Sequence, residues 1–174
     1  MRVITGILKS RQFKSPRSRR TRPMGDKVRG ALFNVLGDIK GLSVLDAFSG
    51  SGALAIEAVS RGASDVWAIE KDAAAYECIV SNLEVLEITT IKATRANVSS
   101  WSSNNTDVLF DIVLCDPPYD AVPEGLIRKL ARHVKPGGTL VLSWPASEKL
   151  PKLTGLRLIQ DQAYAEARLA FYKS

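Results

Sequence analysis

The chain is 174 residues long, with 45% hydrophobic and 24% charged residues. This is an ordinary globular composition, and a domain of this length can bury a full hydrophobic core without disulfides or a structural metal. No apolar run approaches the roughly 20 residues that cross a bilayer, so we expect no membrane span. Met1 leads into a basic stretch without the apolar segment of a secretory signal, which indicates a cytoplasmic protein.

Cysteine and histidine are too few and too scattered for a metal centre. Cys78 and Cys115 lie far apart without a paired spacing, and His133 is the single histidine. These residues cannot complete a usual zinc set, so we expect no metal site. Cys115 is interpreted as core packing and His133 as an exposed residue at a helix end.

Positive charge is concentrated at the N-terminus. The net charge is +6, yet residues 1–30 contain ten basic residues and one acidic residue, so the remainder is mildly acidic. A basic segment on an acidic body is typical of a phosphate-backbone binder, although a solvated tail that aids solubility has the same composition. We therefore expect residues 1–25 to form a basic extension anchored to a single domain over 26–174. The candidate nucleic-acid contacts are Arg11, Lys14, Arg17, Arg19, Arg20, Arg22, Lys27 and Arg29.

The elements follow in chain order. The three- and four-residue spacing of apolar residues predicts an amphipathic helix over 28–36, with Asp26 as its cap. Short apolar runs predict buried strands, and longer periodic segments predict helices. Strands are expected at 43–48, 66–70, 89–94, 110–115, 138–144, 156–162 and 165–173. Besides the helix over 28–36, helices are expected at 53–60, 73–87 and 124–134. Residues 99–107 read as a polar loop and residues 136–138 as a tight turn.

This alternation predicts a fold class. Strands that alternate with helices form βαβ units, which build a parallel sheet covered by helices on both faces. The last two strands are separated by a short turn and should form an antiparallel hairpin at one sheet edge. We expect a doubly wound, mostly parallel, Rossmann-like α/β domain, and such a domain needs no partner, so we expect a monomer.

A glycine-rich loop directly after the first strand is the first candidate site. Residues 46–52, Asp-Ala-Phe-Ser-Gly-Ser-Gly, run into a helix. Its glycines permit a sharp turn and leave room for a ligand against the main chain. Glu70 ends the next strand, where an acid can accept hydrogen bonds from the hydroxyls of an adenosine ribose.

The chemistry of this loop favours one nucleotide ligand over another. A dinucleotide site expects a GxGxxG loop that faces a pyrophosphate, whereas here Asp46 precedes only two glycines. An acid suits a cationic ligand, and S-adenosylmethionine carries a sulfonium and an amino group. Asn97 follows the third strand, where its side chain can meet the adenine. The candidate cofactor contacts are Asp46, Phe48, Ser49, Gly50, Ser51, Gly52, Glu70, Lys71, Asn97 and Val98.

The second candidate site ends the fourth strand. Asp116, Pro117, Pro118 and Tyr119 follow the buried run 110–115. Prolines make the backbone rigid and remove N–H donors, so nearby carbonyls are presented as acceptors. A carboxylate and a carbonyl that accept both hydrogens of an exocyclic amine make its nitrogen more nucleophilic, and Tyr119 can stack on the base. These four residues are the candidate catalytic group.

With these motifs the chain resembles the RsmD family of bacterial methyltransferases, which form N2-methylguanine in small-subunit ribosomal RNA. The resemblance rests on Thr21-Arg22-Pro23, Asp26 to Arg29, Ala31 to Asn34, Leu45-Asp46, Gly50 to Leu54, Ser60 to Ala63 and Asp116 to Tyr119. It implies a class I methyltransferase fold, S-adenosylmethionine as cofactor, and ribosomal RNA or a small-subunit assembly intermediate as partner. It assigns Asp46, Gly50 and Glu70 to the cofactor, the residues from Asp116 to Tyr119 to the guanine, and the basic segment to the RNA.

The chain also departs from that family, and alternatives stay open. Met24 and Gly25 stand where the family usually has hydroxyl residues, Gly30 where it has Glu, and Asn97 where many members have an acid, and the segment 143–145 lacks the acidic pattern. Another RNA, a DNA amine or a protein glutamine amide would present the same nitrogen to Asp116 and Pro117. A non-catalytic RNA-binding or assembly module with this fold is a further alternative.

Overall fold

The computed structural model describes residues 1–16, 24–118 and 124–174, and its elements alternate as expected. The described helices are α1 (Asp26–Leu36), α2 (Ala53–Ser60), α3 (Ala73–Leu86), α4 (Val98–Asn104) and α5 (Glu124–Ala131). The described strands are β1 (Ser43–Asp46), β2 (Asp65–Glu70), β3 (Ile91–Arg95), β4 (Phe110–Cys115), β5 (Val134–Pro145), β6 (Arg157–Tyr164) and β7 (Ala167–Lys173). None of the described helices is both long enough and apolar enough to cross a membrane.

The described strands form one sheet in the order β3-β2-β1-β4-β5-β7-β6. β1 pairs in parallel with β2 and β4, β2 pairs in parallel with β3, and β4 pairs in parallel with β5. The last two strands pair antiparallel with each other, and β7 also pairs antiparallel with β5. The doubly wound, mostly parallel sheet with a C-terminal hairpin is therefore confirmed.

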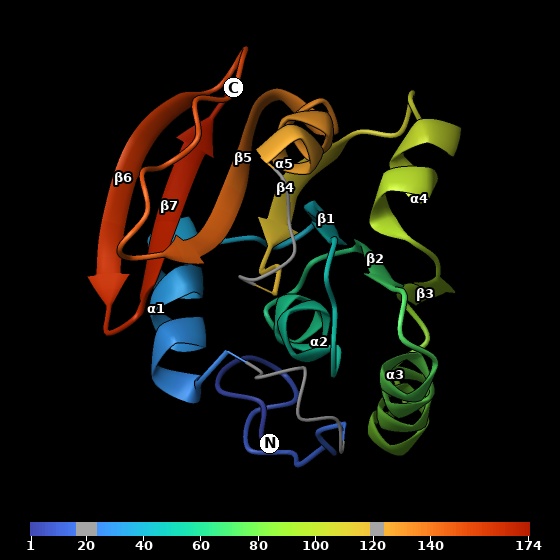
Figure 1. Cartoon of the computed structure of the whole chain (residues 1–174). Helices are drawn as coiled ribbons and strands as arrows, with labels where there is room; N and C mark the ends of the chain where they lie inside the picture. The colour runs from blue at the N-terminus through green and yellow to red at the C-terminus, as the bar shows by residue number, and fades with distance from the viewer. Residues whose placement is uncertain (17–23, 119–123) are drawn as a thin grey trace.

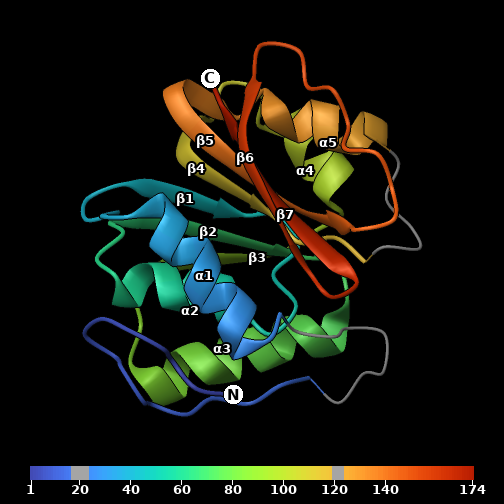
Figure 2. The same ribbon diagram turned by 90° about the vertical axis from the view of Figure 1, so that its left-hand side faces the viewer.

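Helices cover both faces of the sheet, as the two views in Figures 1 and 2 show. α1, α2 and α3 lie on one face, where Phe33, Ile56 and Ile79 are buried in a common cluster. α4 and α5 lie on the other face, where Trp101 and Ile127 belong to a second buried cluster. Because the central strands are buried on both faces, consecutive apolar residues occur within β1 at 44–45 and within β4 at 112–115.

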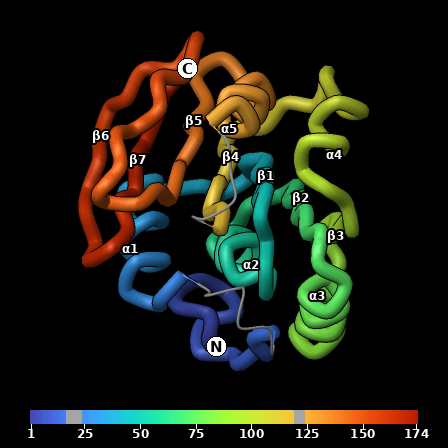
Figure 3. Tube along the Cα trace, viewed as in Figure 1, coloured from blue at the N-terminus to red at the C-terminus, as the bar shows by residue number. Residues whose placement is uncertain are grey.

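The described part of the N-terminal segment is packed against the domain and folds back on itself. Val3 and Phe13 are buried in the cluster that contains residues of α1, α2 and α3. Arg2 forms an isolated antiparallel bridge with Gln12. The trace in Figure 3 runs from the N-terminus beneath α1 and α2. The first residues are therefore anchored to the core.

Three local predictions are wrong, each for a tertiary reason. The expected loop 99–107 contains the helix α4, because Val98 and Trp101 pack into the second cluster. Residues 136–138 lie within β5, where the register with β4 shifts and Gly137 takes a positive φ of 74°. His133 is buried instead of exposed, and its ring lies within 2.7 Å of both the Ser102 Oγ and the Val108 carbonyl oxygen.

The beginning of α1 also differs from the prediction. Asp26 is the first helical residue, and the N-cap position is Gly25, which has no capping side chain. The Asp26 carboxylate instead pairs with Arg2 at 3.2 Å and with Arg29 at 3.0 Å. The acid therefore connects α1 to the N-terminal segment and does not cap the helix.

Candidate functional site

The two candidate motifs lie at the same edge of the sheet. β1 and β4 are parallel neighbours, with Asp46 beside Leu114 in the register, and the Ala47 N–H donates to the Leu114 carbonyl at 3.0 Å. The loop that follows β1 and the turn that follows β4 therefore both leave the carboxyl ends of adjacent strands, as Figure 1 shows. In open α/β sheets this edge is where ligands bind.

The loop after β1 has the conformation that its glycines suggested. Gly50 has a φ of 54° and Gly52 a φ of 80°, both in the left-handed region that favours glycine. The Gly52 N–H donates to the Ser49 carbonyl at 2.7 Å, which closes a tight turn before α2. A Cβ atom at Gly50 would meet no other atom within 4 Å, so the backbone there faces open space. A ligand can approach this main chain closely.

Glu70 holds this loop from the end of β2. Its Oε2 accepts a hydrogen bond from the Gly50 N–H at 2.8 Å, and its Oε1 accepts one from the Asp72 N–H, also at 2.8 Å. The carboxylate is buried, and each of its oxygens has a second acceptor position. A loop-shaping role is thus added to the ribose contact expected from the sequence, and the two are compatible.

Asp46 is the most unusual group at this edge. It is fully buried, and its Oδ2 accepts a hydrogen bond from the Ala55 N–H at 3.2 Å, while its Oδ1 has no partner among the described residues. Burial, helped by the nearby Asp116 and Glu70 carboxylates, raises the pKa of Asp46 to about 7, although interactions with the Ser49 side chain and the Ala55 N–H lower it. A buried carboxylate with a free oxygen suits a cationic ligand, because a positive charge offsets the cost of burying the ionised form.

Asp116 begins the turn after β4. Burial raises its pKa to about 6, while a hydrogen bond with the Ser143 side chain lowers it. Pro117 is buried and Pro118 is exposed. Ser143 is a site residue that the sequence reasoning missed, since only the pairing of Cys115 with Leu142 on β5 reveals that Ser143 ends beside Asp116.

The other predicted cofactor contacts occupy varied positions. Ser49 and Ser51 are buried within the loop, Phe48 packs partly buried against the second cluster, and Lys71 is exposed after β2. Asn97 uses its side-chain oxygen to cap α4, accepting from the Ser99 N–H at 2.9 Å and the Ser100 N–H at 3.4 Å. Val98 is buried as the first residue of that helix.

One predicted nucleic-acid contact is contradicted. The Arg29 side chain has no exposed surface, so its guanidinium cannot reach a phosphate, and it donates instead to the Arg2 carbonyl at 2.7 Å. Lys14 and Lys27 are exposed, and Arg11 is exposed while it donates to the Val85 and Leu86 carbonyls at the end of α3. The predicted residues Arg17, Arg19, Arg20, Arg22 and Tyr119 lie outside the described residues.

Comparison with known proteins places the chain among methyltransferases. The family model described as "Conserved hypothetical protein 95" matches residues 1–173. The "Putative rRNA methyltransferase YlbH" of Bacillus subtilis is 31% identical and covers 99% of this chain and 98% of its own length. The "Ribosomal RNA small subunit methyltransferase D" of Escherichia coli K12 is 33% identical, and the match covers 86% of this chain and 72% of that protein. The solved structure of "Putative methyltransferase yhhF" from Escherichia coli superposes with a TM-score of 0.89 at 28% identity. The superposition covers 99% of this chain and 97% of that structure.

Proposed function

This chain belongs to the RsmD family, whose model is described as "Conserved hypothetical protein 95", and we propose on that premise that it is an S-adenosylmethionine-dependent methyltransferase of small-subunit ribosomal RNA. We propose further that the acceptor is the exocyclic N2 amine of a guanine. The relatives' names support the first statement. The turn at Asp116 supports the second, because a carboxylate is suited to accept hydrogen bonds from an amine.

One observation carries the proposal: the Asp46 and Asp116 carboxylates stand at the carboxyl ends of adjacent parallel strands, close enough for each other's charge to matter. A fully buried acid beside a partly buried one is costly unless ligands offset the charges. Asp46, whose Oδ1 has no described partner, fits the positive charge of the cofactor, and the open space beside Gly50 fits its approach to the main chain. The residues present therefore fit S-adenosylmethionine.

The roles of the chain's own groups follow from their positions. When bound, S-adenosylmethionine supplies an activated methyl group. Glu70 shapes the loop through the Gly50 N–H and offers its remaining acceptor positions to a ribose. The Asp116 carboxylate and the Pro117 carbonyl accept the two hydrogens of the amine, and the partial burial of Asp116 limits competition from water. Holding the amine at a fixed place is the main contribution to rate, because the methyl group is already activated.

The identity of the substrate is tested by labelled methyl transfer. The protein is incubated separately with small-subunit ribosomal RNA freed of protein, with small-subunit particles and with DNA, each with tritiated S-adenosylmethionine, and the modified nucleoside is identified. We expect N2-methylguanosine in ribosomal RNA or in the particle. Label in DNA, in another base or in a protein glutamine would replace the proposed acceptor, and cofactor binding without transfer to any of these would favour the non-catalytic module.

The role of Asp116 is tested by the substitution Asp116→Ala. We expect methyl transfer to fall at least about a hundredfold, since the acceptor for the amine is lost, while binding of S-adenosylmethionine measured by calorimetry is retained. Asp107→Ala, at an exposed aspartate outside the site, is the matched control and should keep full activity. Normal turnover by the Asp116→Ala protein would refute the assigned role.

A further inference from the structure

A buried asparagine joins the cofactor loop to the N-terminal segment. Asn82, on α3, is 1% exposed, and its side-chain amide meets the main chain of two distant segments. Its Nδ2 donates to the Ser51 carbonyl at 3.0 Å and to the Lys14 carbonyl at 2.9 Å, and its Oδ1 accepts from the Lys14 N–H at 2.8 Å. Both donor hydrogens are therefore used, one on each segment.

The Ser51 end of this connection lies inside the candidate cofactor loop. Ser51 stands between Gly50 and Gly52, the two residues with positive φ, and it is 3% exposed. The N-terminal segment meets Ser51 a second time, because the Ser51 hydroxyl donates to the Met1 Sδ at 3.4 Å. The loop is thus contacted at Ser51 by Met1 and Asn82, two residues from outside the loop.

The Lys14 end lies where the strongly basic part of the sequence begins. Four arginines follow within the next eight residues, at positions 17, 19, 20 and 22. The cyclic pair of hydrogen bonds between Lys14 and Asn82 fixes the main chain at the point from which this stretch departs. The Lys14 main chain and the Asn82 amide are therefore directly bonded at this point.

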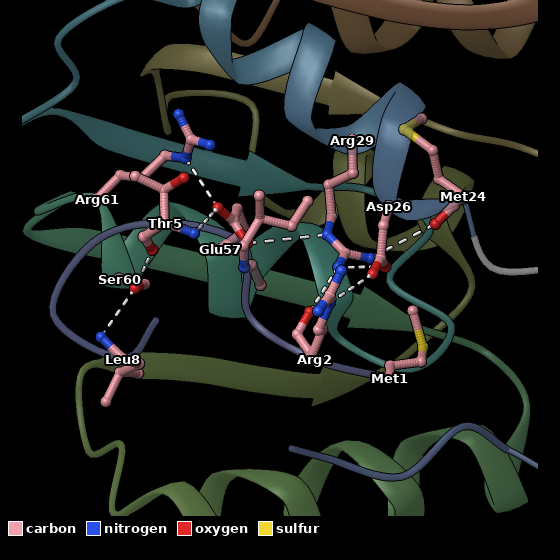
Figure 4. Close-up of polar contacts among 12 residues, drawn as sticks. Met1, Arg2, Thr5, Leu8, Met24, Asp26, Arg29, Glu57, Ser60 and Arg61 are labelled. Atoms are coloured by element: carbon pink, nitrogen blue, oxygen red, sulfur yellow. Dashed lines mark hydrogen bonds and ion pairs between the residues drawn. The ribbon is translucent and has the colours of Figure 1, made fainter. Parts of the chain in front are cut away.

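A second anchor holds the chain on the far side of the same basic stretch. Figure 4 shows Arg29 on α1 reaching both segments, with its Nη2 donating to the Arg2 carbonyl at 2.7 Å and its Nη1 to the Met24 carbonyl at 3.4 Å. Glu57 on α2 accepts from the Ile4 N–H at 2.8 Å and the Thr5 N–H at 3.1 Å. Both described flanks of the basic stretch are thus fixed to the core, and of the Asn82, Arg29 and Glu57 contacts only those of Asn82 also reach the cofactor loop.

We propose that Asn82 is a positioning residue through which nucleic acid bound at the basic N-terminal segment and the cofactor bound at the loop strengthen each other's binding. The inference rests on the proposed function and adds a regulation of its site. Phosphates that immobilise the segment at Lys14 also immobilise Asn82, and a fixed Asn82 holds the Ser51 carbonyl. These hydrogen bonds are already formed in the structure, so each ligand acts by suppressing their transient opening, and the ligand that binds second binds more tightly.

The test is a binding cycle. The affinity for S-adenosylhomocysteine, which cannot be turned over, is measured by calorimetry with and without saturating small-subunit ribosomal RNA freed of protein. We expect the RNA to lower the Kd of the wild-type protein at least about fivefold. We call the ratio of the Kd without RNA to the Kd with RNA the coupling factor. In Asn82→Ala this factor should fall to about one, whatever happens to the affinity measured without RNA. A purely structural role would change the basal affinity and leave the factor as it was.

Two further variants keep the test decisive. Asn82→Asp retains the acceptor for the Lys14 N–H and loses both donor bonds, so its factor should also fall to about one if Asn82→Ala does not fold. Cys78→Ala, one turn earlier on α3, removes the weak contacts of the thiol with the Lys14 carbonyl at 3.6 Å and with the Asn82 Nδ2 at 3.7 Å. It leaves the three hydrogen bonds from Asn82 to Lys14 and Ser51 in place, and should keep the wild-type factor.

The outcomes separate this inference from the proposed function. An S-adenosylhomocysteine affinity of the wild-type protein that does not respond to RNA, or an undiminished factor in the folded Asn82 variants, would overturn the coupling. Coupling that is present in a protein that methylates no ribosomal RNA would leave the inference in place and remove the proposed function.

Discussion

At the scale of single residues, Asp46 shows how function opposes stability at this site. Its pKa in the folded protein is about 7, raised from an ordinary value of 3.8 mainly by burial. A carboxyl whose folded pKa is raised destabilises the fold above the unfolded pKa, and the penalty grows as the pH rises from about 4 to about 7. The chain keeps an acid where a neutral residue would be more stable, which is typical of a binding group.

The pH dependence of cofactor binding tests this assignment. A cation at Asp46 requires the ionised carboxylate, and in the free protein that form is lost as the pH falls through about 7. We therefore expect the affinity for S-adenosylmethionine to fall roughly tenfold between pH 8 and pH 6, with release of protons on binding at the lower pH. Calorimetry in buffers of different ionisation enthalpy measures both quantities.

The matched variant for this prediction is Asp46→Asn. It should bind the cofactor weakly at every pH, and its apoprotein should be more stable than the wild type at pH 8 by about 1 kcal/mol or more, because the buried charge is gone. A wild-type affinity that stays constant from pH 8 to pH 6 would show that Asp46 does not meet the cation.

At the scale of elements, α4 shows how composition conceals a helix. Its sequence is rich in serine, which favours turns when taken alone. Asn97 supplies an N-cap that satisfies two backbone N–H groups, and Trp101 is 5% exposed against Trp67 and Phe110. Burial of one large aromatic and a good cap outweigh the weak helix propensity of the serines.

The substitution Asn97→Ala separates the two roles assigned to this residue. Loss of the cap should reduce the free energy of unfolding by about 1 kcal/mol, which lowers the Tm by roughly 2–4 °C. If Asn97 also meets the adenine, as expected from the sequence, the affinity for S-adenosylmethionine falls in the same variant. Asn104→Ala, at an exposed position at the end of α4, is the control and should alter neither quantity. An unchanged cofactor affinity with a lowered Tm would leave Asn97 as a cap only.

At the scale of the whole molecule, chemistry and stabilisation lie at opposite edges of the sheet. The carboxyl ends of β1, β2 and β4 carry Asp46, Glu70 and Asp116. Toward the amino ends of β1, β4 and β5, the Asp111 carboxylate accepts from the Ser43 hydroxyl at 2.6 Å and from the Lys135 ammonium at 2.9 Å. These bonds tie three strands together without contacting the candidate site.

The Asp111 cluster gives a stability prediction with a defined pH window. Burial opposes ionisation of Asp111, but the bonds from Ser43 and Lys135 outweigh it and lower its pKa to about 2. A carboxyl with a depressed folded pKa stabilises the fold above its ordinary pKa, near 4, and loses that contribution as the pH falls toward 2. Asp111→Asn should therefore cost about 1 kcal/mol at pH 7, discounted for the partial exposure of the pair, and almost nothing near pH 2.

Urea unfolding at the two pH values measures this difference, and the methyl-transfer activity of the folded variant should stay unchanged. A stability loss of equal size at both pH values would show that packing, and not charge, connects these strands.

The sequence by itself determined the fold class and the two motifs of the site. The buried strands and amphipathic helices are local periodic patterns, and the glycine loop and the turn at Asp116 follow their strands directly, so both can be read without any tertiary contact. The boundaries of α2 were predicted from the apolar run and Gly62 alone, because local propensity and burial agree there.

Only the tertiary structure decided which distant residues share an environment. It buried Arg29 away from solvent, placed Ser143 beside Asp116, left one oxygen of Asp46 without a described partner and joined Lys14 to Ser51 through Asn82. The physical reason is that burial and hydrogen bonding depend on the order of strands in the sheet and on the packing of helices across it. Neighbouring positions in that arrangement are dozens of residues apart in the chain, and no local pattern records them.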